Sequence, residues 1–225
     1  MSTLTLNNLS IATAGVTLFA LATVNPSLAA VLTFDDLSTT ASAGVLPTGY
    51  GGFQWTNFGY IKGSALYPGG SGYTNGAVSG KYVAYNGSGE PAIVVSRNQA
   101  FDFTGAYLTG AWENQLQVTV AGLLKGVQQF SQTVTVDTKK PTWFNFNFIG
   151  IDQLTFSPSG GQPAGYKSPQ GGTFIGDYFA MDDFTYTPEE PPIEEPPKEP
   201  VPEPTTILGS LAFGVISLAA RYKRK

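Results

Sequence analysis

The stretch TWFNFNFI, residues 142–149, alternates aromatic and polar side chains with a period of two. Phe144, Phe146 and Phe148 share one side of an extended chain, while Trp143 and the two asparagines share the other. Because successive side chains of a β-strand point to opposite faces, this pattern predicts a strand that places three rings in a hydrophobic core.

The same period recurs in QTVTV, residues 132–136, where Val134 and Val136 alternate with threonines. Similar runs return about every 10 residues between turn signals, and no window of about 12 residues has clean helical periodicity. We therefore predict an all-β domain over residues 31–187, folded as an antiparallel β-sandwich. The turn NGSGE at 86–90 predicts a hairpin, because Asn and Gly tolerate positive φ. The expected strands are 31–34, 53–61, 81–85, 92–96, 106–112, 116–122, 128–136, 142–149, 153–157 and 178–186.

The composition supports a packed core and excludes several kinds of chemistry. Of the 225 residues, 42% are hydrophobic and 13% aromatic, while only 12% are charged, about half the usual share. The chain contains no Cys and no His. Disulfides, thiolate chemistry, the usual zinc and haem ligands and a Ser-His-Asp triad are therefore excluded.

The first residues are typical of a removable leader. The run 11–24 is apolar and uncharged, which suits a signal-peptide core and is short for a bilayer span. Ser27 and Ala29 fit the small-x-small cleavage rule, so we predict a signal peptide over 1–30 that the Sec machinery handles. No Lys or Arg precedes Lys62, which leaves the amino terminus as the only positive charge before the run. The alternative is a buried helix of the mature domain.

The last residues combine an apolar run with a basic end. Residues 205–220 are uncharged and would span about 24 Å as a helix, a little less than a hydrocarbon core. Long basic side chains can reach the headgroups and extend that span, so we predict a transmembrane helix with a cytoplasmic tail over 221–225. The basic residues that stop the span are Arg221, Lys223, Arg224 and Lys225.

Val201 and the tripeptide Pro202-Glu203-Pro204 precede this helix and complete an ordered trio of PEP motif, apolar segment and basic end. The trio resembles the PEP-CTERM sorting signal of bacterial exported proteins, also called the ice-binding protein C-terminal domain. The resemblance covers 201–225. It implies an inner-membrane-anchored precursor, recognition by an exosortase, cleavage near the PEP motif, and transfer to the cell surface or extracellular matrix.

A spacer over 188–204 joins the domain to this signal. Its eight prolines and six glutamates cannot form a core and predict a stiff, solvated linker of polyproline type. The formal charge is −3 over the domain, −5 over the linker and +4 over the tail. Since the folded part has no basic patch, the charge pattern argues against a nucleic-acid partner.

The domain resembles the concanavalin-like or galactose-binding-like jelly rolls of exported bacterial modules. Four short fragments carry this resemblance, and they imply a fold without implying a particular sugar. The fragments are FDDL (34–37), FDFTGAYLTGAW (101–112), FIGIDQLTFS (148–157) and MDDFTY (181–186).

Two acidic pairs, Asp35-Asp36 and Asp182-Asp183, fall in the first and last expected strands, which are commonly neighbours in such sandwiches. Alternation would put Asp182 on the same side as Phe184, and Asp36 on the same side as Phe34. An unpaired carboxylate at a core edge is unfavourable, so a structural calcium ion is one candidate partner. The alternative is that both pairs are solvated or bonded to backbone N–H groups at strand ends.

Two glycine-rich stretches carry candidate ligand-binding residues. Exposed rings on loops stack on sugar faces, while Asn and Asp contact sugar hydroxyls. The alternative is that these tyrosines hold their own loops against the sandwich; Trp112 and Trp143 are expected in the core or on a sheet face. The candidates are Tyr60, Tyr67 and Tyr73 in the stretch 60–76, and Tyr166 and Asp177 in the stretch 157–178.

Together these features predict an exported, non-enzymatic β-sandwich that acts as a structural or carbohydrate-associated module at the surface or in the matrix. The alternative is a hydrolase or lyase that uses a carboxylate pair on matrix polysaccharide, although no spacing singles out catalytic residues. Ice binding is suggested only by the second name of the motif, because the sequence lacks regularly spaced threonines.

Overall fold

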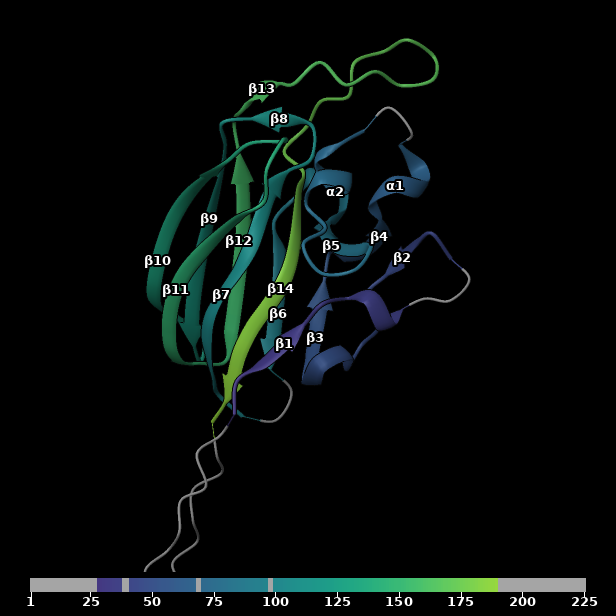
Figure 1. The fold of residues 1–225 in the computed structure, drawn as a ribbon. Coiled ribbons are helices and arrows are strands. Elements are labelled where there is room, and N and C mark those ends of the chain that lie inside the picture. Colours follow the sequence, from purple (N-terminus) through teal and green to yellow (C-terminus); the bar gives the residue numbers. More distant parts are fainter. Residues whose placement is uncertain (1–27, 38–40, 68–69, 97–98, 190–225) are drawn as a thin grey trace, which may run out of the picture. The chain divides into compact units, whose positions relative to one another are not determined.

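The computed structural model describes residues 28–37, 41–67, 70–96 and 99–189. It contains two antiparallel sheets that share one hydrophobic core, and short helices beside one of them (Figure 1). The chain divides into the units Met1–Glu189 and Glu190–Lys225, of which only the first is described.

The larger sheet has seven strands. Its main path runs β11 (Thr142–Ile151), β7 (Phe101–Gly110), β14 (Phe179–Pro188), β5 (Tyr82–Asn86), β4 (Phe58–Lys62) and β2 (Ala43–Val45), and β1 (Ala30–Leu32) also pairs with β14. The first and last strands are therefore neighbours, as predicted, with Ala30 opposite Tyr186.

The second sheet has five strands in the order β10 (Val127–Val136), β9 (Leu116–Leu124), β12 (Gln153–Ser159), β6 (Ala92–Ser96) and β3 (Phe53–Thr56). The remaining elements are the pair β8 (Glu113–Asn114) and β13 (Gln162–Pro163), helices α1 (Gly63–Leu66) and α2 (Gly72–Asn75), and the 3-10 turns η1 (Asp35–Leu37), η2 (Tyr50–Gly52) and η3 (Gly87–Gly89).

The core between the sheets is built largely of phenylalanine. Phe146 and Phe148 are buried and Phe144 packs against the core, which confirms the prediction for this strand. The ring of Phe103 lies between those of Phe146 and Phe184, with centroid separations of 5.2 and 4.8 Å. Each fully buried ring contributes roughly 1.5–3 kcal/mol by removing apolar surface from water.

The prediction of an antiparallel β-domain is confirmed, but the expected strand 53–61 is wrong. Asn57 adopts a left-handed conformation, with φ of 58°, and ends β3. Its amide donates to the carbonyl oxygens of Gly87, Glu90 and Pro91 at 2.9, 3.2 and 3.0 Å. This bend sends β3 to one sheet and β4 to the other.

The expected hairpin at 86–90 is also wrong. β5 and β6 flank this turn, but they belong to different sheets and do not pair. The turn is a crossover at one end of the sandwich. Its glycines suit a tight bend of either kind, so the residues alone do not distinguish a hairpin from a crossover.

Alternation also fails at both acidic pairs. Asp183 has φ of 49° and lies in an irregularity of the β14–β7 pairing. Met181 and Phe184 therefore both face the core, and Asp182 does not share a side with Phe184. At the other pair, Phe34 has φ of 61° and Asp36 lies in η1 rather than in a strand.

The predicted apolar helices within 1–30 and 205–220 fall on residues outside the described ranges, as does the PEP motif. Within the described ranges, neither short helix has the length and hydropathy that a bilayer span requires. The jelly-roll topology stays a prediction.

Candidate functional site

A second aromatic cluster lies on the outer side of the seven-stranded sheet. Ile61, Val83 and Ala180 project from β4, β5 and β14, and Tyr73 of α2 and Trp112 cover them. The helices α1 and α2 lie beside β4 and β5, away from the main core (Figure 1).

Close backbone approach holds α2 in this place. The N–H of Gly72 donates to the carbonyl of Ala111 at 2.9 Å. A Cβ atom on Gly72 would lie 1.7 Å from the carbonyl oxygen of Gly110, so only glycine fits. The Ser71 hydroxyl accepts from the N–H of Thr74 at 3.2 Å and caps the helix.

The two glycine-rich stretches meet at Trp112. The ring of Phe174 stacks on Trp112 with centroids 4.3 Å apart and planes at 18°. Tyr67 and Tyr73 meet the indole edge-on at 4.6 and 5.2 Å, and Tyr73 also meets Tyr85 at 5.6 Å. Edge-to-face and offset stacks of this kind add about 0.5–1.5 kcal/mol beyond area burial.

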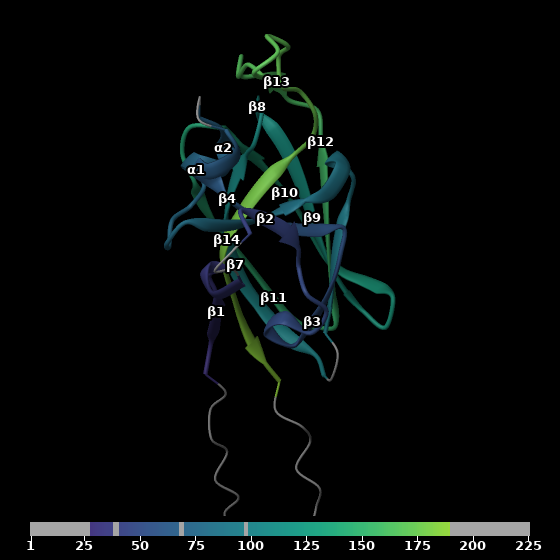
Figure 2. The same cartoon turned by 90° about the vertical axis from the view of Figure 1, so that its right-hand side faces the viewer.

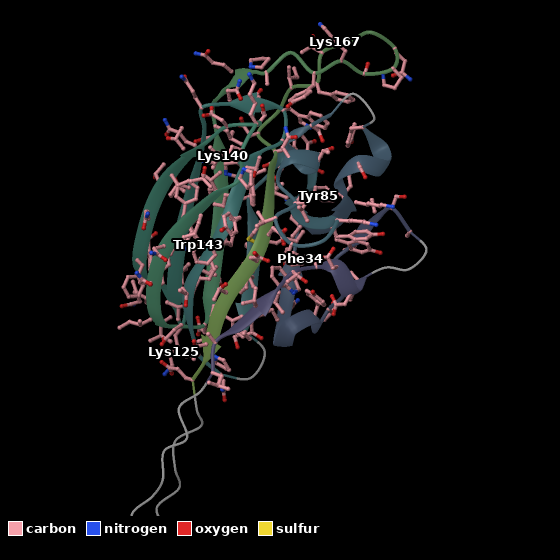
Figure 3. The ribbon with its side chains drawn as sticks, viewed as in Figure 1. Phe34, Tyr85, Lys125, Lys140, Trp143 and Lys167 are labelled. Carbon is pink, nitrogen blue, oxygen red and sulfur yellow. The ribbon has the colours of Figure 1, made fainter. Side chains whose placement is uncertain are left out.

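These rings enclose an open pocket of about 290 Å³, which we call the aromatic pocket. Tyr85 stands on β5 beside the short helices, whereas Trp143 stands on β11, at the edge of the same sheet (Figure 3). The lining residues are Ala43, Ile61, Tyr67, Tyr73, Tyr85, Trp112, Phe174, Ile175 and Tyr178.

The phenol groups of Tyr67, Tyr73 and Tyr85 are neutral hydrogen-bonding groups. Burial raises the pKa values of Tyr67, Tyr73 and Tyr85, and the neighbouring phenols raise them further. Tyr178 lines the same pocket and is one of the phenols that raise these three pKa values. None of the four hydroxyls is hydrogen-bonded to another residue in the described part of the chain.

The structure brings three of the five predicted ligand-binding residues together. Tyr67 and Tyr73 line the aromatic pocket, and Tyr166 packs beside it, 6.0 Å from Trp112. Tyr60 lies on β4 next to Tyr82, at 6.1 Å, and packs against the main core instead.

Asp177 is half-buried and does not line the pocket. Its backbone carbonyl accepts from the Asn86 amide at 3.0 Å. The hydrogen bond that holds Asp177 in the fold is therefore made by its backbone carbonyl and not by its carboxylate.

The sequence predicts only two of the nine described residues that line the pocket, Tyr67 and Tyr73. Tyr85 comes from an expected strand, and its ring lies against Gly59 on the next strand. Phe174 and Tyr178 belong to the second glycine-rich stretch, for which the sequence predicts Tyr166 and Asp177 instead. Trp112 is buried, as predicted, yet it forms the wall on which the other rings gather.

The acidic pairs hold one loop from two sides. The buried carboxylate of Asp182 accepts from the N–H groups of Val78 and Ser79 at 2.7 and 3.0 Å, and from the Ser79 hydroxyl at 3.1 Å. Asp35 accepts from the N–H groups of Lys81 and Tyr82 at 2.6 and 3.1 Å. Each carboxylate therefore has backbone donors as partners.

The second member of each pair binds a side chain. Asp36 accepts from the Tyr50 hydroxyl at 2.8 Å, and Asp183 accepts from the Ser79 hydroxyl at 2.6 Å. Among the described residues, no three acidic side chains gather in the manner of a metal site. Calcium stays a prediction of the sequence.

Comparison with known proteins gives one family match. The model of the PEP-CTERM protein-sorting motif matches residues 200–225. The chain carries a PEP-CTERM sorting motif. No curated protein matches the chain.

Several solved structures resemble the chain at low identity. A DUF4465 family protein from Bacteroides ovatus is 13% identical, with a TM-score of 0.42 over 73% of this chain and 90% of that one. TmCBM61, solved with β-1,4-galactotriose, is 14% identical, with a TM-score of 0.31 over 64% and 95%. CBM51 from Clostridium perfringens GH95, solved with methyl-galactose, is 12% identical, with a TM-score of 0.31 over 70% and 100%. These similarities carry no functional argument.

Proposed function

We propose that this PEP-CTERM chain is an exported, non-enzymatic carbohydrate-binding module, which an exosortase sorts to the cell surface or extracellular matrix. The sorting motif supports the destination, since its membrane helix and basic tail would hold a precursor until cleavage near Pro202-Glu203-Pro204. The aromatic pocket supports the binding function.

The decisive observation is the combination of ring walls and unpaired phenols. Aromatic rings stack on the apolar faces of sugar rings, and convergent hydroxyls satisfy sugar hydroxyl groups. Tyr67, Tyr73, Tyr85 and Tyr178 supply such hydroxyls, and no described residue occupies them. A pocket of about 290 Å³ suits one or two sugar units.

The pocket supports binding rather than hydrolysis. Glycosidases place two carboxylates on either side of the bond they cleave. The described residues that line the pocket include neither Asp nor Glu. A polysaccharide incubated with the protein should therefore show no increase in reducing ends.

A glycan array followed by calorimetry tests the proposal. The full chain is used in a detergent without a sugar headgroup, because such a headgroup would compete for the pocket. Tyr85→Phe removes a pocket hydroxyl and should weaken oligosaccharide binding about fivefold to tenfold, the effect of one hydrogen bond. Tyr60→Phe is the matched control and should bind like the original chain. Equal affinities for all three proteins would contradict a role for the pocket.

A further inference from the structure

The outer face of the five-stranded sheet carries no charge. Across the described residues, none of its five strands contains Asp, Glu, Lys or Arg. The seven-stranded sheet, by contrast, contains Lys62, Asp102, Asp182 and Asp183. In the described part of the chain, turns next to these strands carry charges, as at Lys125 and Asp152. We call this surface the uncharged face.

Strand register aligns hydroxyl and amide groups on this face. Their sequence neighbours, such as Val118, Val134 and Phe156, are buried, so these polar side chains point outward. Thr119 and Thr133 pair across two strands, with hydroxyl oxygens 2.8 Å apart. The successive rows across β10, β9 and β12 are Thr135, Gln117 and Ser159; Thr133, Thr119 and Ser157; and Ser131, Ala121 and Thr155.

The rows continue onto β6 and β3 with apolar and polar residues. Thr155 lies opposite Ile93, which lies opposite Thr56, and Gln153 lies opposite Val95, which lies opposite Gln54. Within the described ranges, neither α1 nor α2 covers this face, since both lie on the opposite side of the sandwich. Figure 2 shows α1 and α2 on the left and β9 and β12 on the right.

The chemistry of this face selects its partner. The solvated face of an antiparallel sheet is polar, and any charged residues on it are costly to desolvate on binding. A face with only hydroxyls, amides and aliphatic groups such as Leu123, Ile93 and Val95 can be desolvated without removing a charge from water. An acidic polymer would find no cation on it, and the net charge of −4 would repel that polymer. A second copy would bury few large apolar side chains, because most of the outward groups are polar.

We infer that the uncharged face is a second binding surface, for a neutral polysaccharide chain that lies across the strands. Together with the aromatic pocket, which rests on the function proposed above, it would let one domain bridge two polysaccharide chains from opposite sides. The protein would then act as a cross-linker of a neutral matrix polymer. The two surfaces would bind different lengths of polysaccharide: the pocket would bind one or two sugar units, whereas the face would bind a longer stretch of the chain.

Adsorption to insoluble neutral polysaccharides tests the face. The full chain, in the same sugar-free detergent, is mixed with cellulose, β-1,3-glucan and β-1,4-galactan, and the unbound fraction is measured. Thr133→Lys places a charge at the middle of the face and should reduce adsorption to the preferred polymer at least tenfold. Thr142→Lys places the same charge on an exposed position of β11 and should not change adsorption. If Thr133→Lys lowers the melting temperature, Thr133→Val replaces only the hydroxyl by a methyl group and should still weaken adsorption severalfold.

Two readouts separate this inference from the proposed function. Oligosaccharide binding should fall in Tyr85→Phe and persist in Thr133→Lys, whereas polymer adsorption should show the reverse. Sedimentation of a soluble neutral polymer by the protein should need both surfaces. If adsorption is lost in Tyr85→Phe but unchanged in Thr133→Lys, the uncharged face is not a binding surface, and the aromatic pocket alone binds the polymer. If the original chain adsorbs to the polymer but binds no oligosaccharide, the proposed function of the aromatic pocket is wrong, and so is the bridging of two chains. Binding to ice or to an acidic polymer alone would overturn the assignment of a neutral polysaccharide.

Discussion

The ring of Phe174 lies flat on the indole of Trp112, with centroids 4.3 Å apart, and this contact joins two glycine-rich stretches that are distant in the sequence. Trp112 is almost fully buried, whereas Phe174 is half-exposed and completes the wall of the aromatic pocket. Removing the outer ring should therefore affect the pocket more than the fold.

Phe174→Ala should weaken oligosaccharide binding at least tenfold, because it deletes a stacking surface, while stability falls by about 1 kcal/mol. Calorimetry and thermal melting measure the two effects. Phe144→Ala removes a half-buried ring on β11 and should lower stability without changing affinity. Similar losses of affinity in both variants would show that the effect is global.

Gly72→Ala should displace α2. The added methyl group would overlap the carbonyl oxygen of Gly110, and shifting the helix would separate Tyr73 from Trp112. We expect a loss of about 1–3 kcal/mol, as for overpacked sites, and weaker ligand binding. Gly126→Ala adds the same methyl group where no atom lies within 4 Å, but at φ of 77°, so it reports backbone strain alone. Binding that is intact in Gly72→Ala would contradict the role of this close approach.

Asp182 should make stability depend on pH. Burial raises the pKa of Asp182 to about 6. Hydrogen bonds from the N–H groups of Ser79 and Val78 lower the pKa and offset part of this effect. Between about pH 4 and pH 6, the Asp182 carboxyl group is therefore protonated in the folded state and ionised in the unfolded state. Stability should be highest below this window and fall by about 2–3 kcal/mol as pH rises through it.

Asp182→Asn should flatten this slope. It should also lower stability at pH 7 by about 1–3 kcal/mol. The amide NH₂ would face a backbone N–H group whose hydrogen bond the carboxylate now accepts, so two donors would meet. Denaturation at several pH values measures both effects. Asp177→Asn, at a half-buried position, should keep the slope; a slope that persists in Asp182→Asn would assign it to another group.

Calcium is tested by chelation. If a calcium ion binds the pairs at Asp35 and Asp182, a chelator should lower the melting temperature of the full chain by several degrees, since ligand binding to the folded state stabilises it. Added calcium should reverse the change, and magnesium should not. A melting curve that is the same with and without chelator would end the calcium prediction.

The sorting motif is tested in the exporting cell. Replacement of Pro202, Glu203 and Pro204 by alanine should leave an uncut, membrane-retained precursor, because two prolines keep this segment extended for a protease. Fractionation and immunoblotting detect the precursor. Alanines at Pro191 and Pro192 in the same linker serve as the control and should permit normal processing. Normal release of the first variant would refute the assignment.

Local pattern was sufficient for most of the strands and for the sorting signal. The three phenylalanines of β11 lie at the core because alternation is a property of each strand, and the PEP trio is read from adjacent residues. Alternation misled at Asn57 and Asp183, two left-handed residues at which consecutive core residues, Trp55 and Phe58 or Met181 and Phe184, are three positions apart instead of two. Such bends depend on partners far away, like the carbonyl groups that bind Asn57.

The functional surfaces are products of tertiary structure. Tyr67, Tyr85 and Phe174 come from separate segments, and only the docking of α2 and the second glycine-rich stretch against the sheet brings their rings together. The rows of the uncharged face likewise follow from strand register, which sets Thr133 beside Thr119. A one-dimensional pattern contains the period of each strand, but not which strands become neighbours, because pairing is decided by the long-range packing of one shared core.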